Sequence, residues 1–317
     1  MAVYVNTNYS ALQGQRYLGN VQNQLTTTYQ RLSSGMRINS AKDDAAGLQI
    51  ADRLTSQING LNQGNRNASD GIALAQTAEA GMDEISGMLQ KIRTLAVQAS
   101  NGTNTMADKQ ALSKEATALA TEVTRIAKQT TFAGKTILNG KQANSIDPAA
   151  GGAGAGGNDT GKTQTITLQV GSNKGDTISF NLENLVFSKI GVDGGIAADK
   201  FNDGTTAFAK ETAAGVVAVN FSVAGAPQDI IGFMDQMIAY VDGKRADLGA
   251  TQNRLESSIR NQSNVAANEA DARSRIRDAD FAEESANLSQ QSIIQQAAAS
   301  MLMQANTRPQ LGLSLLG

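Results

Sequence analysis

Both ends of this 317-residue chain combine a helical repeat with an almost complete lack of charge. Arg16 is the only charged residue among residues 1–30, and Arg308 is the only one among residues 288–317. An amphipathic helix in water normally carries charged side chains on its outer face. Two interpretations remain open: the ends are disordered tails, or they are helices, marginal alone, that fold when they pair with each other and with other copies of the chain.

Apolar and small residues recur at spacings of three and four through the N-terminal third, which predicts helices. The first repeat runs from residue 11 to 32 as a heptad seam and should end at Gly35, a common type of C-cap. A second helix is expected from about residue 44 to 100, beginning at Asp43 and Asp44, because carboxylates favour the positive end of a helix dipole. At 1.5 Å per residue this helix would be roughly 85 Å long, a length typical of bundles and filaments.

The C-terminal third carries the same periodicity. A helix is expected to begin near Pro227, a residue well suited to a first turn, and to reach a polar junction at residues 274–280. A final helix should begin near Phe281 and end at Pro309, before an apolar tail.

The middle of the chain has a different character. Residues 151–157 consist of glycine and alanine, which favours a flexible surface segment. Alternating patterns predict strands at residues 163–170, 176–182 and 216–223. The expected fold class is therefore mainly α: a long coiled-coil or helical-bundle rod formed by both termini, with a small α+β insert in the middle.

The side-chain inventory excludes most catalytic chemistry. The chain has no cysteine or histidine, so thiolate nucleophiles, Ser-His-Asp triads and histidine-containing zinc sites are impossible. The paired carboxylates Asp43–Asp44 and Glu283–Glu284 lie at expected helix starts, where capping explains them better than acid–base catalysis. We expect no enzyme activity, no cofactor and no metal site. A net charge of −2 and the lack of a long apolar run predict no nucleic-acid or membrane partner.

Four segments carry a resemblance to a known family. The densest is RLSSGMRINSAKDDAAGLQIA, at residues 31–51. The others are RADLGA at 245–250, SRIRDADF at 274–281, and MQAN at 303–306, the last followed by a proline and a leucine-rich end. In sequence, order and distance from the termini, these segments are similar to those of bacterial flagellins, the subunits of the flagellar filament. The resemblance leaves out the middle, which varies freely in that family, and covers about residues 1–140 and 228–317.

The resemblance implies an architecture for the assembled protein. The two termini would pair as helices that line the central channel of the filament, the next segments would form a rod around them, and the insert would point outward. Uncharged termini would suit a channel through which unfolded chains pass. Charged side chains on the channel wall would form ion pairs with the passing chain, and such contacts are stronger and longer-lived than those of neutral amides. The implied segments are an N-terminal inner-tube helix (1–43), the N-terminal part of the rod bundle with a short hairpin (44–140), a variable outer α+β domain (141–226), the C-terminal part of the rod bundle (227–273) and a C-terminal inner-tube helix (274–317).

Two sets of residues are expected to make subunit contacts. The inner-tube packing residues are apolar side chains of the terminal helices: Leu18, Val21, Leu25, Leu32, Leu288, Ile294, Met301 and Leu302. The linker residues are charged side chains where the two helical layers would join: Arg31, Arg37, Lys42, Asp43, Asp44, Arg275, Arg277 and Asp278. The linker residues either pair within and between subunits or form a solvated, capped connection, and the sequence leaves both interpretations open.

A further trait of the family is recognition by an innate immune receptor of the Toll-like class. The surface that this receptor recognises resembles residues 90–98 with one residue of the adjacent helix, so the candidate contacts are Gln90, Lys91, Arg93, Leu95, Gln98 and Glu115. Lys91 stands where strongly recognised flagellins have Arg, and Thr94 where they have Glu; a lysine lacks the bidentate fork of arginine. The alternative is a rod helix that packs in the filament, and Leu95 fits either role.

The resemblance also implies partners and a location. The expected partners are other copies of the chain, the flagellar export chaperone, the filament cap and the hook-junction proteins. No basic region precedes an apolar run near the N-terminus, so we expect no Sec-type signal peptide. Members of the family are exported unfolded through the flagellar type III apparatus without a cleaved signal, so the expected location is extracellular, in the filament.

Two other classes of protein share these features. A hook–filament junction protein has terminal helices of this kind but connects rather than propagates, and the intact motifs at both ends argue against it. Some flagellins carry a zinc protease in the variable region, and the absence of histidine excludes that version. The sequence therefore favours a structural subunit that self-assembles into the flagellar filament used for swimming, with the junction protein as the alternative.

Overall fold

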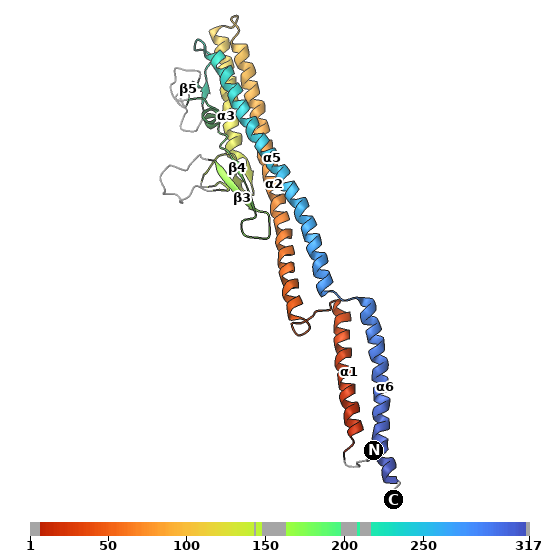
Figure 1. The fold of residues 1–317 in the computed structure, drawn as a ribbon. Helices are drawn as coiled ribbons and strands as arrows, with labels where there is room; N and C mark the ends of the chain where they lie inside the picture. The colour runs from red at the N-terminus through yellow and green to blue at the C-terminus, as the bar shows by residue number, and fades with distance from the viewer. Residues whose placement is uncertain (1–6, 143, 148–162, 198–207, 210–216, 315–317) are drawn as a thin grey trace, which may run out of the picture. The chain divides into compact units, whose positions relative to one another are not determined.

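The computed structural model describes residues 7–142, 144–147, 163–197, 208–209 and 217–314. Its elements, drawn in Figure 1, are α1 (Tyr9–Ser34), α2 (Ala45–Ala99), α3 (Met106–Gln129), β1 (Thr131–Phe132), β2 (Lys135–Thr136), β3 (Gln164–Gln169), β4 (Thr177–Leu182), α4 (Phe187–Asp193), β5 (Phe208–Ala209), β6 (Ala218–Val219), α5 (Ala226–Arg277) and α6 (Phe281–Ser314). The chain divides into two compact units, Met1–Asn59 with Asn264–Gly317, and Gly60–Ser263. The predicted flexible segment at residues 151–157 lies outside the described residues.

The first unit contains the terminal helices α1 and α6, which pack against each other. Asn8 caps the start of α1, because its side-chain oxygen accepts a hydrogen bond from the Ala11 amide at 3.1 Å. Gly35 ends the helix in the left-handed conformation, with φ of 69°. A left-handed C-cap favours glycine because a Cβ would be strained there, so the predicted end of this helix is confirmed.

Two predicted helix ends are wrong. The polar junction expected at residues 274–280 is shorter, because α5 continues to Arg277 and the Asp278 amide still donates to the Ser274 carbonyl at 2.9 Å. Arginines are good helix formers and suit the negative end of the dipole, so the basic residues there extend the helix. At the other end, α6 runs through Pro309 to Ser314. A proline removes its own helical hydrogen bond but leaves the donors of its neighbours in place.

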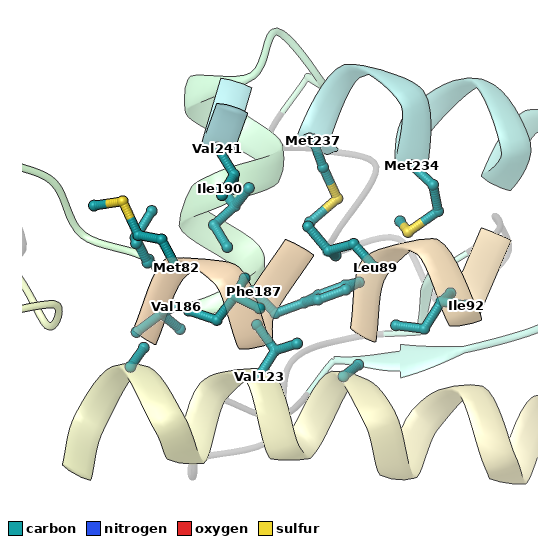
Figure 2. Close-up of a cluster of buried hydrophobic side chains, with 14 of the residues drawn as sticks. Met82, Leu89, Ile92, Val123, Val186, Phe187, Ile190, Met234, Met237 and Val241 are labelled. Atoms are coloured by element: carbon teal, nitrogen blue, oxygen red, sulfur yellow. The ribbon is translucent and has the colours of Figure 1, made fainter. Parts of the chain in front are cut away.

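The second unit is built on a bundle of α2, α3 and α5, whose apolar stripes meet. Figure 2 shows Met82, Leu89 and Ile92 of α2 facing Val123 of α3 and three side chains of α5, with residues around α4 filling the space between. Alanines take several of the remaining core positions. Small residues of this kind let helices approach closely, which explains how a chain with 4% aromatic residues builds a packed core. The buried members of this core include Ala78, Met82, Ile85, Leu89, Ile92, Ala116, Ala120, Val123, Phe187, Ile190, Met234, Met237 and Val241.

Short hairpins follow the helices. β1 and β2 are joined by Ala133 and Gly134, both at positive φ, the conformation required by a tight type I′ turn. β3 and β4 pair antiparallel in the register Gln164↔Leu182 to Gln169↔Thr177. They confirm two of the three predicted strands, and the inward-facing residues of β4 are Phe180 and Leu182.

The third predicted strand, at residues 216–223, is wrong in extent. Among the described residues of this range, 217–223, only Ala218–Val219 form a strand, β6, which pairs with β5. The Val219 amide donates to the Thr117 hydroxyl at 3.0 Å, and the Phe221 amide donates to the Ser113 hydroxyl at 2.9 Å. Side chains of α3 therefore accept hydrogen bonds that a neighbouring strand would otherwise accept, and regular pairing ends.

Glycines of α2 allow the β3–β4 hairpin to approach the helix backbone. A Cβ at Gly64 would overlap the Val170 carbonyl oxygen, and one at Gly60 would lie 2.8 Å from the Ser172 Cβ. The Asn67 side-chain amide donates to the Gln169 carbonyl at 2.9 Å and ties the hairpin to the helix. Close backbone approach of this kind requires a residue without a side chain.

Candidate assembly site

The α1–α6 pair has a thin interior. Among the described side chains of these two helices, Val21, Thr28, Glu284 and Ala298 are buried. Most of the predicted packing residues are only partly buried: Leu18, Leu25, Leu32, Leu288, Ile294 and Leu302. Met301, predicted to belong to the same stripe, is 72% exposed. Two helices alone therefore bury little of the apolar surface that they carry.

Small residues and neutral amides hold the pair together. A Cβ added at Gly14 would lie 3.3 Å from the Leu302 Cδ1, so α1 offers a flat surface to this leucine. The Thr28 hydroxyl donates to the Gln291 side-chain oxygen at 3.2 Å, and the Asn8 side-chain amide donates to the Ala305 carbonyl at 2.8 Å. These contacts use hydrogen bonds without charge, as the composition of the two ends requires.

Large apolar side chains remain exposed on both helices. They are Tyr9, Leu12, Tyr17 and Tyr29 on α1, and Phe281, Ile293, Met301 and Met303 on α6. A groove of about 910 Å³ lies between the helices, lined by residues that include Gly14, Tyr17, Ile294, Ala298 and Met301. Exposed large apolar side chains gathered on two paired helices mark a candidate interaction site.

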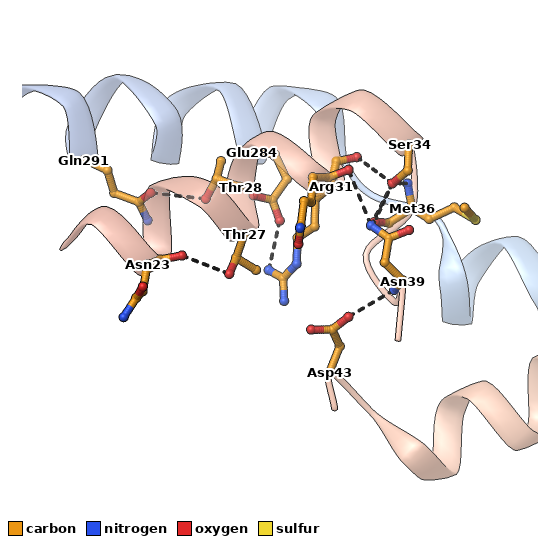
Figure 3. Close-up of polar contacts among 11 residues, drawn as sticks. Asn23, Thr27, Thr28, Arg31, Ser34, Met36, Asn39, Asp43, Glu284 and Gln291 are labelled. Atoms are coloured by element: carbon orange, nitrogen blue, oxygen red, sulfur yellow. Dashed lines mark hydrogen bonds and ion pairs between the residues drawn. The ribbon is translucent and has the colours of Figure 1, made fainter. Parts of the chain in front are cut away.

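One ion pair joins the end of α1 to the start of α6 (Figure 3). The Arg31 Nη1 lies 3.1 Å from the Glu284 Oε1, and the Glu284 side chain is 9% exposed. The interpretation of Glu284 as a capping residue is wrong, because the Asp280 side chain accepts the hydrogen bonds from the first amides of α6, those of Ala282 and Glu283. The local sequence pattern therefore does not identify Glu284 as a contact residue.

Backbone hydrogen bonds hold the two linkers side by side. The Arg37 amide donates to the Arg277 carbonyl at 2.6 Å, and the Ala279 amide donates to the Gly35 carbonyl at 3.0 Å. Met36 and Asp278 form an antiparallel bridge between the same segments. The Arg37 guanidinium donates to the Ile276 carbonyl at 2.7 Å. Within the subunit, then, Arg37 binds a backbone carbonyl rather than any of the predicted carboxylates.

The remaining linker residues cap local structure or lie exposed. The Asp43 carboxylate accepts hydrogen bonds from the Ser40 amide, the Ser40 hydroxyl and the Asn39 amide, and these bonds hold its pKa below the usual range. Asp44 accepts from the Gly47 amide at 2.9 Å, as expected of an N-cap. Three further predicted residues complete the set: Arg275 pairs with Asp271, Asp278 accepts from Ser274, and Lys42 is exposed. Inside the subunit, the linker is a capped connection.

Comparison with known proteins decides the family. The models of the bacterial flagellin N-terminal and C-terminal helical regions match residues 5–143 and 231–316. Flagellin A of Vibrio anguillarum is 37% identical over an alignment of 382 positions, which covers 100% of both chains. The protein belongs to the bacterial flagellin family. Flagellin C of Vibrio cholerae is likewise similar, at 38% identity over an alignment of 378 positions with 100% of both chains covered. This family builds the extracellular flagellar filament by self-polymerisation, so the chain is a structural subunit of that filament.

A solved structure agrees at the level of fold. It is that of a putative flagellar hook-associated protein from Vibrio parahaemolyticus, with a TM-score of 0.53 and 14% sequence identity. The match covers 74% of this chain and 100% of that chain. At this identity the similarity extends to the fold alone, so it does not favour the junction protein over the filament subunit.

The receptor-like residues of this flagellin lie on α2 and α3 in the second unit. The Arg93 Nε lies 2.6 Å from the Asp235 Oδ1, which raises the pKa of the guanidinium, and the Lys91 Nζ lies 3.7 Å from the Glu115 Oε1. Gln90 and Gln98 are exposed, whereas Leu95 is 7% exposed and belongs to the core. The partner of Arg93 is 142 positions away in the sequence, and no local pattern identified it.

In the part of the chain that the structure describes, no helix combines the length and the apolar character that crossing a bilayer requires. No group of three or more acidic side chains in the described ranges is arranged to hold a metal ion.

Proposed function

We propose that α1 and α6 are the assembly element of this filament subunit, and that the protein propagates the filament rather than connecting it to the hook. One observation carries the proposal: both helices expose large apolar side chains while carrying almost no charge. Tyr9 is 73% exposed and Ile293 is 67% exposed, and their sequence neighbours Ser10 and Ile294 line the groove between the helices. Such a surface is suited to contacts with further copies of the same helices.

The energetics support folding on assembly. Burying a leucine contributes about 2 kcal/mol, whereas ordering a residue costs about 1–2 kcal/mol. With only four buried residues among the described side chains, two of them polar, the α1–α6 pair does not offset its own ordering cost. Contacts repeated with neighbouring subunits add the missing burial. The terminal helices would then be unstructured in the free subunit and helical in the filament.

The proposed segments follow from this division of roles. Residues 1–43 and 274–317 would form the inner tube, residues 44–140 and 227–273 the surrounding rod, and residues 141–226 the outward-facing domain. The predicted inner-tube packing residues would contact neighbouring subunits, with Met301 accessible to them at the open groove of its own pair. The charged linker residues would supply contacts between subunits through side chains such as Lys42, which is exposed within the subunit.

Export and partners form a further part of the proposal. Terminal helices that are marginal alone suit passage through the flagellar type III apparatus as an unfolded chain, without a cleaved signal. An export chaperone would cover the apolar surface of α6 before assembly, and the filament cap and hook-junction proteins would contact the same helices at the two ends of the polymer. The exposed residues Gln90, Lys91 and Gln98, with Glu115, would form a surface for the innate receptor on the free subunit.

Seeded elongation tests the main proposal. Purified protein is added to short filament fragments and followed by electron microscopy and sedimentation, with a variant that lacks residues 288–317 as the control. We expect long filaments from the full chain and none from the truncated chain. Failure of the full chain to elongate seeds would favour the junction protein. Elongation by the truncated chain would show that α6 does not drive assembly.

A further inference from the structure

Two methionines of α6 are unusually accessible. The Met301 side chain is 72% exposed and the Met303 side chain is 67% exposed. Core methionines behave differently: Met82, Met234 and Met237 are at most 1% exposed. Because oxidation of a thioether depends on access, the two α6 sulfurs should react first among these five.

The two exposed methionines lie on different sides of α6. They are two positions apart, which corresponds to about 200° around a helix with 3.6 residues per turn. Met301 lines the groove between α1 and α6, together with Tyr17 and Ile294. A subunit that packs against copies on more than one side would therefore bury both thioethers in its contacts.

We propose that Met301 and Met303 form an oxidation-sensitive site that controls assembly, with a peroxide as the reactant. A lone pair of the thioether sulfur attacks one peroxide oxygen, the O–O bond breaks and an S–O bond forms. The sulfur loses two electrons and becomes a sulfoxide, while hydrogen peroxide is reduced to water. This inference rests on the proposed role of α6 as the assembly element.

The sulfoxide acts at the contact between subunits rather than inside the subunit. Oxidation converts a flexible apolar side chain into a polar one that needs a hydrogen-bond donor. In the free subunit both side chains meet water, so the change leaves the folded second unit intact. Residues 288–307 carry no charged donor, so a sulfoxide oxygen in the contact surface of α6 must find a neutral donor or stay unsatisfied where an apolar thioether had packed, and this cost recurs in every copy.

The experiment uses full-length protein treated with hydrogen peroxide, which is then removed with catalase. Peptide mass spectrometry measures sulfoxide at each methionine, and seeded elongation measures assembly. We expect sulfoxide at Met301 and Met303, little at Met82 and Met234, and loss of elongation. Oxidation of preformed filaments should modify Met301 and Met303 more slowly than oxidation of the free subunit.

Variants assign the effect to the two residues. Met301→Leu with Met303→Leu conserves apolar volume, so this protein should elongate seeds before and after peroxide. Met106→Leu is the matched control, because Met106 is 60% exposed but lies on α3, and this variant should remain sensitive to peroxide. If the double variant elongates seeds but still loses elongation on oxidation, the inference is wrong.

Reversal provides a second test that needs no substitution. Methionine sulfoxide reductases with a thiol reductant convert the sulfoxide back to the thioether and water. Elongation should return when the mass of the α6 peptide returns to its original value, and complete reduction without recovery would overturn the inference. Untreated protein separates the two proposals. If untreated protein fails to elongate seeds, the proposed assembly role of α6 is wrong. If untreated and fully oxidised protein elongate seeds equally, only the proposed oxidation site is wrong.

Discussion

The guanidinium of Arg31 lies 3.1 Å from the carboxylate of Glu284, which is almost completely buried. Arg31 is in the last turn of α1 and Glu284 is in the first turn of α6, so each charge also suits the dipole of its own helix. This pair stands where the charged linkers meet the nearly uncharged terminal helices. It holds the two helices together at the end where they leave the rest of the subunit.

Removing this carboxylate should weaken the α1–α6 pair. We expect Glu284→Ala to lower the stability of the pair by about 1–2 kcal/mol, because a partly buried guanidinium loses its partner. The measurement is the temperature at which assembled filaments dissociate. Glu283→Ala is the matched control, since Glu283 is the exposed neighbour in the same turn. Equal dissociation temperatures for the two variants would contradict a role for the ion pair.

The Asp43 cap predicts a pH dependence of the linker. Its pKa is lowered from 3.8, mainly by the hydrogen bonds from Ser40 and Asn39, with a smaller contribution from the charge of Arg31. A depressed pKa means that the stabilisation is present above the unfolded value and is lost as pH falls through the folded value. Amide exchange at Ser40, corrected for the intrinsic rate, should therefore accelerate as pH drops below 3.8.

The control for this prediction is Asp43→Asn, which keeps an acceptor oxygen but cannot ionise. Its amide exchange at Ser40 should change little over the same pH range. An identical pH profile in the two proteins would show that another group controls the linker.

The close approach at Gly64 predicts a large effect from a single methyl group. Gly64→Ala should destabilise the second unit by about 1–3 kcal/mol, because its Cβ overlaps the Val170 carbonyl oxygen and forces the β3–β4 hairpin away from α2. Gly87→Ala is the matched control on the same helix, since nothing lies within 4 Å of its Cβ. That variant should gain roughly 0.5–1 kcal/mol from helix propensity. Chemical denaturation followed by circular dichroism measures the free energy of unfolding of both variants. If both were destabilised or both were stabilised, the explanation would be refuted.

The helices were predictable because their signals are local. Apolar residues at spacings of three and four gave α2 within a residue at each end, and Gly35 marked the end of α1 because its conformation excludes most other residues. The Arg31–Glu284 pair joins residues 253 positions apart, and a local pattern carries no information about such a partner. The short β6 has the same cause, since hydroxyl groups of α3 accept hydrogen bonds from the Val219 amide of this strand and from the Phe221 amide beyond it.

The candidate assembly site was predictable as a surface but not residue by residue. α6 carries apolar side chains on several sides, including Ile293, Ile294, Met301 and Met303. A helix of this kind has no single stripe whose direction the sequence fixes. Packing against α1 selects which side is covered, and it leaves Met301 exposed at the open groove while Leu302 meets Gly14.

The receptor-like surface predicts a gain of recognition. Lys91→Arg with Thr94→Glu should increase activation of the innate flagellin receptor by the free subunit, because arginine offers a bidentate fork and both positions are exposed. A reporter cell assay measures activation. Adding Arg93→Ala to the double variant should abolish the gain. Equal signalling by the original protein and the double variant would remove the case that these two positions matter.

The strongest test of assembly is a charge placed in the α1–α6 pair. Leu302 is partly buried, and its Cδ1 would lie 3.3 Å from a Cβ at Gly14. Leu302→Asp puts a carboxylate into this apolar contact, and the only cations within residues 1–30 and 288–317 are Arg16 and Arg308. Burying an unpaired polar group costs at least about 2 kcal/mol, and the cost recurs in every subunit of a filament. We expect a soluble protein that does not elongate seeds.

The matched control is Leu302→Met, which conserves apolar volume and should elongate seeds with a loss of less than about 1.5 kcal/mol. Circular dichroism of the Leu302→Asp protein should match that of the original free subunit, because residues 60–263 form a unit whose core does not include Leu302. Sedimentation after seeding then isolates assembly from folding. Filaments of the original stability from Leu302→Asp would show that the contact between α1 and α6 does not drive polymerisation, since no other change offsets a charge repeated along the polymer.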